Sequence, residues 1–277
     1  MGRKIVCVGR NYKDHALELG NPIPTKPMLF LKSPNAYVQE GQPITTPPGC
    51  QNLHQEVELG IVISKTAKNV PRSEAMSYIG GYVVALDMTA RDFQDEAKKA
   101  GAPWFLAKSF DTSCPVSDFI PKDQIQDPHA EELYCRINGV EKQRCRTNAM
   151  IFDIPTLIEY TTRFVTLDEG DLLLTGTPAG GPKVQSDEAV HSSLSTPTVA
   201  TRSNPPILLF RARAQTDLYQ RPSDGGNNGP KHRCCATFAM PLLPIREIRF
   251  DGACGTACRR RQALIPLVLQ LTLCLRQ

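Results

Sequence analysis

Two glutamates stand out in the stretch NLHQEVELGIVIS (52–64), which otherwise has the composition of a buried strand. Side chains alternate between the two faces of a strand, so Glu56 and Glu58 should point the same way, with their Cα atoms about 6.5–7 Å apart. Neighbouring like charges repel each other unless water or a cation lies between them. For a lone Glu-x-Glu pair, a solvent-exposed polar face is the alternative explanation.

A third carboxylate supports the cation rather than the exposed face. Asp87 closes the apolar stretch GYVVAL (81–86), where a charged residue is unexpected. Three carboxylates at strand positions would form an all-oxygen site that suits Mg²⁺ or Mn²⁺ and leaves coordination positions for water or substrate. We therefore predict a metal site made of Glu56, Glu58 and Asp87.

Short strands dominate the elements that must position these residues. Asn138-Gly139 is a strong turn signal and predicts a hairpin over 133–146. Asn11 is the expected N-cap of the helix over 11–20, which Gly20 should stop. The fold class expected from this pattern is α+β, mainly β. Strands are expected at 4–9, 28–32, 55–64, 78–92 and 169–181, and helices at 11–20, 91–101 and 154–164.

Charge and cysteine content exclude several classes of function. Of the 32 Lys and Arg residues, 12 follow residue 183. Residues 1–183 therefore contain 20 Lys and Arg against 22 Asp and Glu. This part of the chain has no basic face for nucleic acid. The apolar run ALIPLVLQLTLCL is too short to span a membrane, and the N-terminal run is too short for a signal peptide. Ten cysteines without a signal are expected to be intracellular thiols.

The sequence changes character near residue 183. We expect a catalytic domain over 1–183 and an atypical, irregular tail over 184–277, because 11 of the tail's 12 basic residues are arginine and its polar, Pro- and Gly-rich stretches have no period. A zinc-binding or adaptor tail is an alternative, although its spacing differs from paired Cys-x2-Cys knuckles. The residues that would bind zinc are His232, Cys234, Cys235, Cys254 and Cys258.

Several motifs together resemble one family. They are GRNYKDH, HQEVELG, GYVVALDMTARDFQ, WFLAKSFDTSCPVS, MIFDI and EGDLLLTGTPAG, in this order between Lys4 and Pro182. This set resembles the fumarylacetoacetate hydrolase superfamily, and within it the small eukaryotic acylpyruvases and oxaloacetate decarboxylases. The resemblance implies a mixed β-sheet roll with few short helices, a homodimer, and a mitochondrial location, with the cytosol as the alternative.

The resemblance also implies roles for individual residues. Glu56, Glu58 and Asp87 match the family's metal ligands, which usually hold Mg²⁺. His15 and Glu18 match a catalytic dyad on a short helix that acts as a lid. Taken alone, a His-x-x-Glu pair on a short helix would be read as a surface pair.

Four further positions match substrate-contacting residues of the family. Lys108 matches a catalytic lysine, and Thr177 matches a loop that approaches the substrate carboxylate. Arg91 and Gln94 are expected beside the same site. Without the resemblance these residues would be a solvated lysine, an ordinary turn and an exposed helix start.

The implied substrate is a small 2-oxo acid, with neither nucleic acid nor membrane as a partner. A bound cation would stabilise the enolate of pyruvate, which is the leaving fragment in both acylpyruvate hydrolysis and oxaloacetate decarboxylation. Oxaloacetate keto–enol tautomerisation is a third possible activity, because a proton shift at C3 passes through a related enol. Hydrolysis needs an activated water, which assigns His15 as general base, Glu18 as its orienting partner, and Lys108 as a stabiliser of oxyanion charge. The alternative is an impaired variant that keeps the ligands but lacks the closing strands of the sheet.

Overall fold

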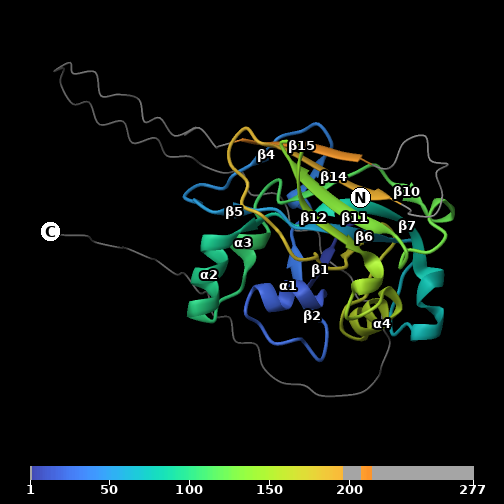
Figure 1. Cartoon of the computed structure of the whole chain (residues 1–277). Coiled ribbons are helices and arrows are strands. Elements are labelled where there is room, and N and C mark those ends of the chain that lie inside the picture. Colours follow the sequence, from blue (N-terminus) through green and yellow to red (C-terminus); the bar gives the residue numbers. More distant parts are fainter. Residues whose placement is uncertain (1, 196–206, 214–277) are drawn as a thin grey trace, which may run out of the picture. The chain divides into compact units, whose positions relative to one another are not determined.

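This computed structural model describes residues 2–195 and 207–213. An eight-stranded sheet is its largest element of secondary structure (Figure 1). Its order is β2-β1-β13-β6-β7-β9-β3, and β10 pairs with β7. The expected mainly β architecture is confirmed. The strands are β1 (Ile5–Gly9), β2 (Met28–Lys32), β3 (Tyr37–Gln39), β6 (Val57–Ile63), β7 (Ile79–Leu86), β9 (Cys114–Val116), β10 (Ile120–Pro121) and β13 (Leu172–Leu174).

The central strands of this sheet are buried on both faces. In β1, Val6 and Val8 belong to one hydrophobic cluster, while Ile5 and Cys7 belong to a second cluster on the opposite face. Strands covered on both sides have near-continuous apolar sequences rather than alternating ones. A carboxylate on such a strand is therefore removed from bulk water and needs a compensating partner.

A second sheet has the order β12-β11-β14-β15-β4 and lies over β6 (Figure 1). Leu133 and Val190 of this sheet share one core with Leu59 of β6. Asn138 and Gly139 have φ of 49° and 81°, as the predicted hairpin turn requires. The strands are β4 (Ile44–Thr45), β11 (Glu132–Ile137), β12 (Val140–Arg146), β14 (Ala189–Ser195) and β15 (Ile207–Arg213); β5 (Leu53–His54) and β8 (Thr89–Ala90) form a separate pair.

The irregular structure expected from residue 184 on is wrong over β14 and β15. Strand β14 pairs with β11 and with β15, and its Val190 and Leu194 are buried. The sequence concealed this strand because Ser192 and Ser193 are also buried, so hydrophobic alternation is lost. Both strands belong to the second sheet, and the alternative of an impaired variant stays a prediction. The remainder of the expected tail, with His232, Cys234, Cys235, Cys254 and Cys258, lies outside the described residues.

Four short α-helices complete this part of the chain. The α2 helix ends at Gly101, which has the left-handed φ of 63° expected of a helix stop. The N-cap of α1 is Tyr12 and not Asn11, because the Asn11 side chain is used in tertiary hydrogen bonds. Within the described ranges, no helix combines the length and apolarity needed to cross a bilayer. The helices are α1 (Lys13–Glu18), α2 (Arg91–Ala100), α3 (Phe105–Lys108) and α4 (Ile154–Phe164).

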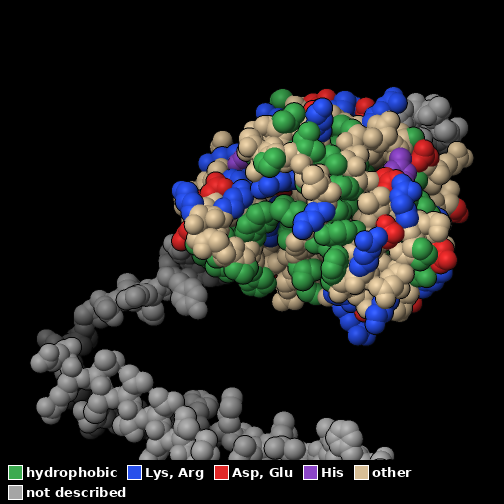
Figure 2. Space-filling model, turned by 90° about the horizontal axis from the view of Figure 1, so that it is seen from below, with side chains coloured by type: hydrophobic (Ala, Val, Ile, Leu, Met, Phe, Trp, Pro, Cys, Tyr) green, Lys and Arg blue, Asp and Glu red, His purple; other side chains and the backbone are tan. Residues whose placement is uncertain are grey.

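Large hydrophobic side chains are also exposed. Leu17, Leu31, Phe105 and Leu106 are each more than half exposed. Hydrophobic side chains gather on the face drawn in Figure 2, with Lys and Arg among them. Such surfaces are typical of protein–protein contacts.

Candidate metal centre

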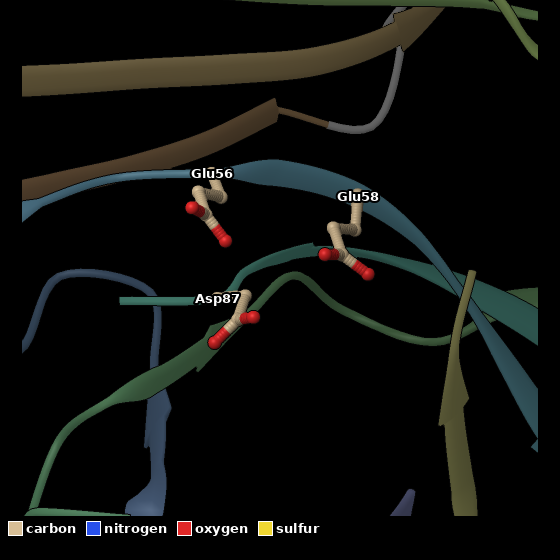
Figure 3. Close-up of side chains that lie close together, drawn as sticks. All are labelled: Glu56, Glu58 and Asp87. Carbon is tan, nitrogen blue, oxygen red and sulfur yellow. The ribbon is translucent and has the colours of Figure 1, made fainter. Parts of the chain in front are cut away.

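Three carboxylates meet where β6 and β7 lie side by side. Glu56 precedes β6, and its carbonyl accepts a hydrogen bond from the N–H of Asp87 at 2.8 Å, so the two residues face each other across the ladder. Glu58 follows two residues later on the same side of β6. One carboxylate oxygen from each residue lies within 4.8 Å of the other two, and Figure 3 shows the carboxylates around a common space. At most 5% of any of the three is exposed.

Lys108 lies between two of these carboxylates. Its Nζ is 2.9 Å from Glu56 Oε2 and 2.6 Å from Asp87 Oδ2, and it also donates to Thr89 Oγ1 at 2.6 Å. All three N–H groups of the ammonium are therefore engaged. Burial would lower the pKa of Lys108, but the charges of Asp87 and Glu56 raise it, so the ammonium stays charged.

A second buried lysine, which the sequence reasoning missed, holds the other oxygen of Asp87. Lys32 Nζ lies 2.7 Å from Asp87 Oδ1 and donates to the carbonyls of Met88 and Lys108 at 3.0 and 2.6 Å. Lys32 therefore ties the edge strand β2 to both Asp87 and the end of α3. A lysine that closes the apolar stretch MLFLK resembles any solvated strand end, so no local pattern distinguishes it.

Arg91 completes the positive charge around the site. Its guanidinium pairs with Glu56 Oε1 and donates to Gln94 Oε1 at 2.7 Å. Burial would raise the pKa of Glu56, but the charges of Lys108 and Arg91 lower it below the usual range. Glu56 is accordingly ionised at neutral pH.

Glu58 has the opposite electrostatic environment. Burial, reinforced by the negative charge of Asp87, raises the pKa of Glu58 well above its usual value. A hydrogen bond from Gly176 N to Glu58 Oε2 at 2.7 Å opposes this shift only in part. Among the described residues, the positive charge near Glu58 is thus too small to stabilise its ionised form.

The donor set fits a hard divalent cation. Glu56, Glu58 and Asp87 offer only oxygen, converge within 4.8 Å, and contain one carboxylate that its protein surroundings destabilise. Carboxylate oxygens are the ligands that Mg²⁺ and Mn²⁺ prefer. A divalent charge would favour the ionised form of Glu58.

The predicted dyad lies beside this centre. His15 is 5% exposed, and its Nδ1 is 3.4 Å from Glu18 Oε2. Glu18 Oε2 also accepts a hydrogen bond from Gly180 N at 3.1 Å. The two residues predicted as a dyad are therefore in contact, and their catalytic role and the lid function of their helix stay predictions.

Thr177 follows a glycine whose backbone no other residue type would tolerate. Gly176 has φ of 99°, and a Cβ at this position would lie 2.7 Å from Asn11 Cβ. Asn11 donates from Nδ2 to the carbonyls of Phe152 and Thr175 at 3.0 and 2.8 Å. This anchoring role of Asn11, which the capping prediction missed, fixes the segment that faces the Gly176–Thr177 loop.

Eight of the nine predicted site residues line one cavity. Glu18 is the exception and reaches the site through its contact with His15. Their proposed chemical roles stay predictions, since no described contact involves a substrate. The lining residues predicted from sequence are His15, Glu56, Glu58, Asp87, Arg91, Gln94, Lys108 and Thr177, and Arg10 lines the same cavity.

Fold and site together define a class: a mainly β protein whose buried carboxylates, beside an imidazole, are arranged to hold a divalent cation. Residues 4–204 match the family described as "Fumarylacetoacetate (FAA) hydrolase C-terminal". The chain therefore belongs to the fumarylacetoacetate hydrolase family, and the resemblance seen in the motifs is confirmed.

Individual proteins of this family are similar to the chain over most of their length. "Oxaloacetate tautomerase fahd-1, mitochondrial" from Caenorhabditis elegans is 68% identical over 195 residues, 70% of this chain and 91% of that protein. "Oxaloacetate decarboxylase, mitochondrial" from Dictyostelium discoideum is 49% identical over 195 residues, 70% of this chain and 89% of that protein. The crystal structure of fumarylpyruvate hydrolase from Pseudomonas aeruginosa in complex with Mn²⁺ and pyruvate has a TM-score of 0.71 and 32% identity, covering 77% of this chain and 91% of the other.

Proposed function

We propose that this chain is a divalent-metal-dependent oxaloacetate tautomerase. The observation that carries the proposal is that the carboxylate trio, His15, Arg91, Gln94, Lys108 and Thr177 line one cavity. The name of the Caenorhabditis elegans relative supports oxaloacetate as substrate. The relatives named as mitochondrial support the same compartment for this chain, as predicted from the motifs.

Glu56, Glu58 and Asp87 would hold the cation. We propose Mg²⁺ as the resident ion, with Mn²⁺ able to replace it, since both prefer oxygen ligands and the Pseudomonas aeruginosa structure contains Mn²⁺. When bound, such an ion supplies positive charge that stabilises an enolate oxygen.

The reaction moves one proton. The C3–H bond of oxaloacetate breaks, its electrons form the C2=C3 double bond, and the C2 carbonyl oxygen gains a proton. His15 takes the proton from C3 and returns it to the C2 oxygen, because imidazole both accepts and donates a proton near neutral pH. Glu18, 3.4 Å from Nδ1, orients the ring.

Arg10 favours tautomerisation over decarboxylation in this proposal. It lines the cavity and makes no ion pair among the described residues, whereas Arg91 and Lys108 are both paired with Glu56. Its φ of 58° is uncommon outside glycine, and the adjacent Asn11 is anchored, so the backbone position is fixed. A cation on the C4 carboxylate of oxaloacetate stabilises the charge that this group loses when it leaves as CO₂.

Decarboxylation is the second candidate, favoured by the name of the Dictyostelium discoideum relative. Here the C3–C4 bond breaks, CO₂ leaves, and the electrons of that bond form the C2=C3 double bond of the enolate of pyruvate, which then gains a proton at C3. Acylpyruvate hydrolysis uses the same enolate as leaving fragment, with His15 activating a water.

A homodimer, as predicted from the family, would cover part of the exposed hydrophobic surface.

One assay tests the proposal and ranks the candidates. Purified chain is mixed with oxaloacetate or acetylpyruvate, with Mg²⁺ or with a chelator, while enol absorbance and pyruvate release are followed separately. We expect Mg²⁺-dependent equilibration of keto and enol oxaloacetate that is faster than pyruvate release. An unchanged equilibration rate with either Mg²⁺ or Mn²⁺, relative to the ion alone, would refute the proposal.

A further inference from the structure

We infer that Gln143 is a positioning residue that fixes the Thr177 loop against the segment carrying Glu56 and Glu58. Gln143 lies on β12, in the sheet that contributes none of the predicted metal ligands. The consequence for turnover rests on the proposed function, whereas the consequence for ligand binding does not.

The side-chain amide of Gln143 makes hydrogen bonds with both of its ends. Its Oε1 accepts from Gln55 Nε2 at 2.9 Å and from Val57 N at 3.2 Å. Its Nε2 donates to Thr177 Oγ1 at 2.9 Å and to the carbonyl of Pro178 at 2.8 Å. A backbone N–H can only donate and a carbonyl can only accept, so Val57 and Pro178 fix the orientation of the amide.

The burial of this amide is exceptional for its strand. Gln143 is 1% exposed, whereas its neighbours Lys142 and Arg144 on β12 are exposed. A buried amide without hydrogen-bond partners would destabilise the folded state. All four hydrogen bonds are made to residues beside the site. Gln143, from the second sheet, therefore connects the segment that carries Glu56 and Glu58 to the loop that carries Thr177.

The loop that Gln143 holds is packed tightly onto β12 and touches the dyad. Gly180 has φ of 90°, and a Cβ there would lie 2.4 Å from the carbonyl of Lys142. The N–H of Gly180 donates to Glu18 Oε2 at 3.1 Å. The loop is thus held by Gln143 on one side and contacts the His15–Glu18 pair on the other, so loosening it displaces Thr177 and Glu18 together.

Two variants separate positioning from folding. Gln143→Met keeps the volume and removes all four hydrogen bonds, while Gln143→Glu keeps the acceptor toward Val57 and loses the donors toward Thr177 and Pro178. Arg144→Ala, at the next position on the exposed face of β12, is the matched control. Each protein is examined for its melting temperature, Mn²⁺ affinity, oxalate affinity in the presence of Mn²⁺, and kcat and KM for oxaloacetate.

Both Gln143 variants are expected to bind oxalate about 10–100-fold more weakly and to lose a similar factor in kcat/KM, mainly through KM. Their Mn²⁺ affinity should match that of the wild type, because Glu56, Glu58 and Asp87 are retained. If Gln143→Met does not fold, Gln143→Glu provides the same comparison. Arg144→Ala removes surface ion pairs with Glu132 and Glu141, and should resemble the wild type in Mn²⁺ affinity, oxalate affinity, kcat and KM.

A lower melting temperature with unchanged oxalate affinity and unchanged KM would overturn the inference, since it would show a role in stability alone. If the wild type binds oxalate but does not turn over oxaloacetate, the proposed function fails while oxalate affinity still decides the role of Gln143. If the wild type turns over oxaloacetate and the Gln143 variants equal it, only the inference about Gln143 fails.

Discussion

Two buried carboxylate regions lie at opposite ends of β13, and they are satisfied in different ways. Before the strand, Asp171 accepts hydrogen bonds from the N–H groups of Arg3, Lys4 and Asp168, and Lys4 Nζ lies 2.8 Å from it. After the strand, Glu58 accepts one hydrogen bond from the described part of the chain, from Gly176 N, and lies beside Asp87 and Glu56. Burial alone therefore does not distinguish a structural carboxylate from a metal ligand.

The directions of the two pKa shifts express this difference. Burial would raise the pKa of Asp171, but the hydrogen bonds from Asp168 and Lys4 lower it. Burial and the charge of Asp87 raise the pKa of Glu58. The protein thus favours the ionised form of Asp171 but the neutral form of Glu58. The two regions should consequently respond to substitution in opposite ways.

The largest expected effect is at Glu58. Glu58→Gln keeps an acceptor for Gly176 but removes a charged metal ligand, so Mn²⁺ affinity should be lost and turnover should fall to the background rate. The melting temperature of the metal-free chain should not fall, because burial beside Asp87 already favours the neutral form of Glu58, and Gln is neutral too. Titration with Mn²⁺, an oxaloacetate assay and thermal unfolding check these outcomes. Retained activity with Mn²⁺ bound would contradict the assignment of Glu58.

His15 tests whether the dyad acts on the substrate rather than on the metal. His15→Gln should lower kcat about 10²–10⁴-fold, because the proton at C3 loses its acceptor, while Mn²⁺ affinity stays unchanged. Steady-state kinetics and a Mn²⁺ titration provide the comparison. Glu18→Gln, which leaves the imidazole in place, should have a smaller effect on kcat. A normal kcat for His15→Gln would remove His15 from the mechanism.

Arg10 tests which reaction the site favours. Arg10→Met should raise the ratio of decarboxylation to tautomerisation about tenfold, in line with the loss of one charge-assisted hydrogen bond to the C4 carboxylate. Pyruvate release and enol absorbance measured on the same sample give this ratio. Lys98→Met is the matched control, because Lys98 lines the same cavity but pairs with Asp95 at 3.4 Å. An equal change in both variants would show a general charge effect.

Asp171 should affect stability and leave catalysis intact. Asp171→Asn should lower the free energy of unfolding by about 1–3 kcal/mol at pH 7, because donors at Asp168 and Lys4 lose their acceptor. The lowered pKa means that the stabilisation is present above the unfolded pKa of about 3.9 and is lost as the pH falls through the folded value. Denaturant unfolding at pH 7 and in acid measures this effect. The difference in the free energy of unfolding between Asp171→Asn and wild type should be smaller in acid than at pH 7. A difference that persists in acid would contradict this origin.

Local patterns predicted the elements that carry the three proposed metal ligands. Glu56 and Glu58 could be assigned to one face because strand periodicity is two, and Asp87 was visible as a charge at the end of an apolar run. The helix stop at Gly101 and the hairpin at Asn138-Gly139 were predicted for the same reason, since each depends on a few adjacent residues.

Residues that act through long-range contacts could not be predicted in this way. Lys32 and Gln143 lie 55 and 34 positions from Asp87 and Thr177, and each looks like a polar residue of an ordinary strand. Only the pairing of the sheets places them beside the site. Strand β14 was missed because its buried Ser192 and Ser193 interrupt the apolar alternation by which a half-buried strand is recognised.

The most direct test of the metal centre is a crystal structure of the chain with Mg²⁺ and oxalate. We expect one Mg²⁺ ion bound by an oxygen from each of Glu56, Glu58 and Asp87, with metal–oxygen distances of about 2.0–2.1 Å and oxalate among its remaining ligands. Oxalate bound in the cavity without an ion at these three side chains would contradict it.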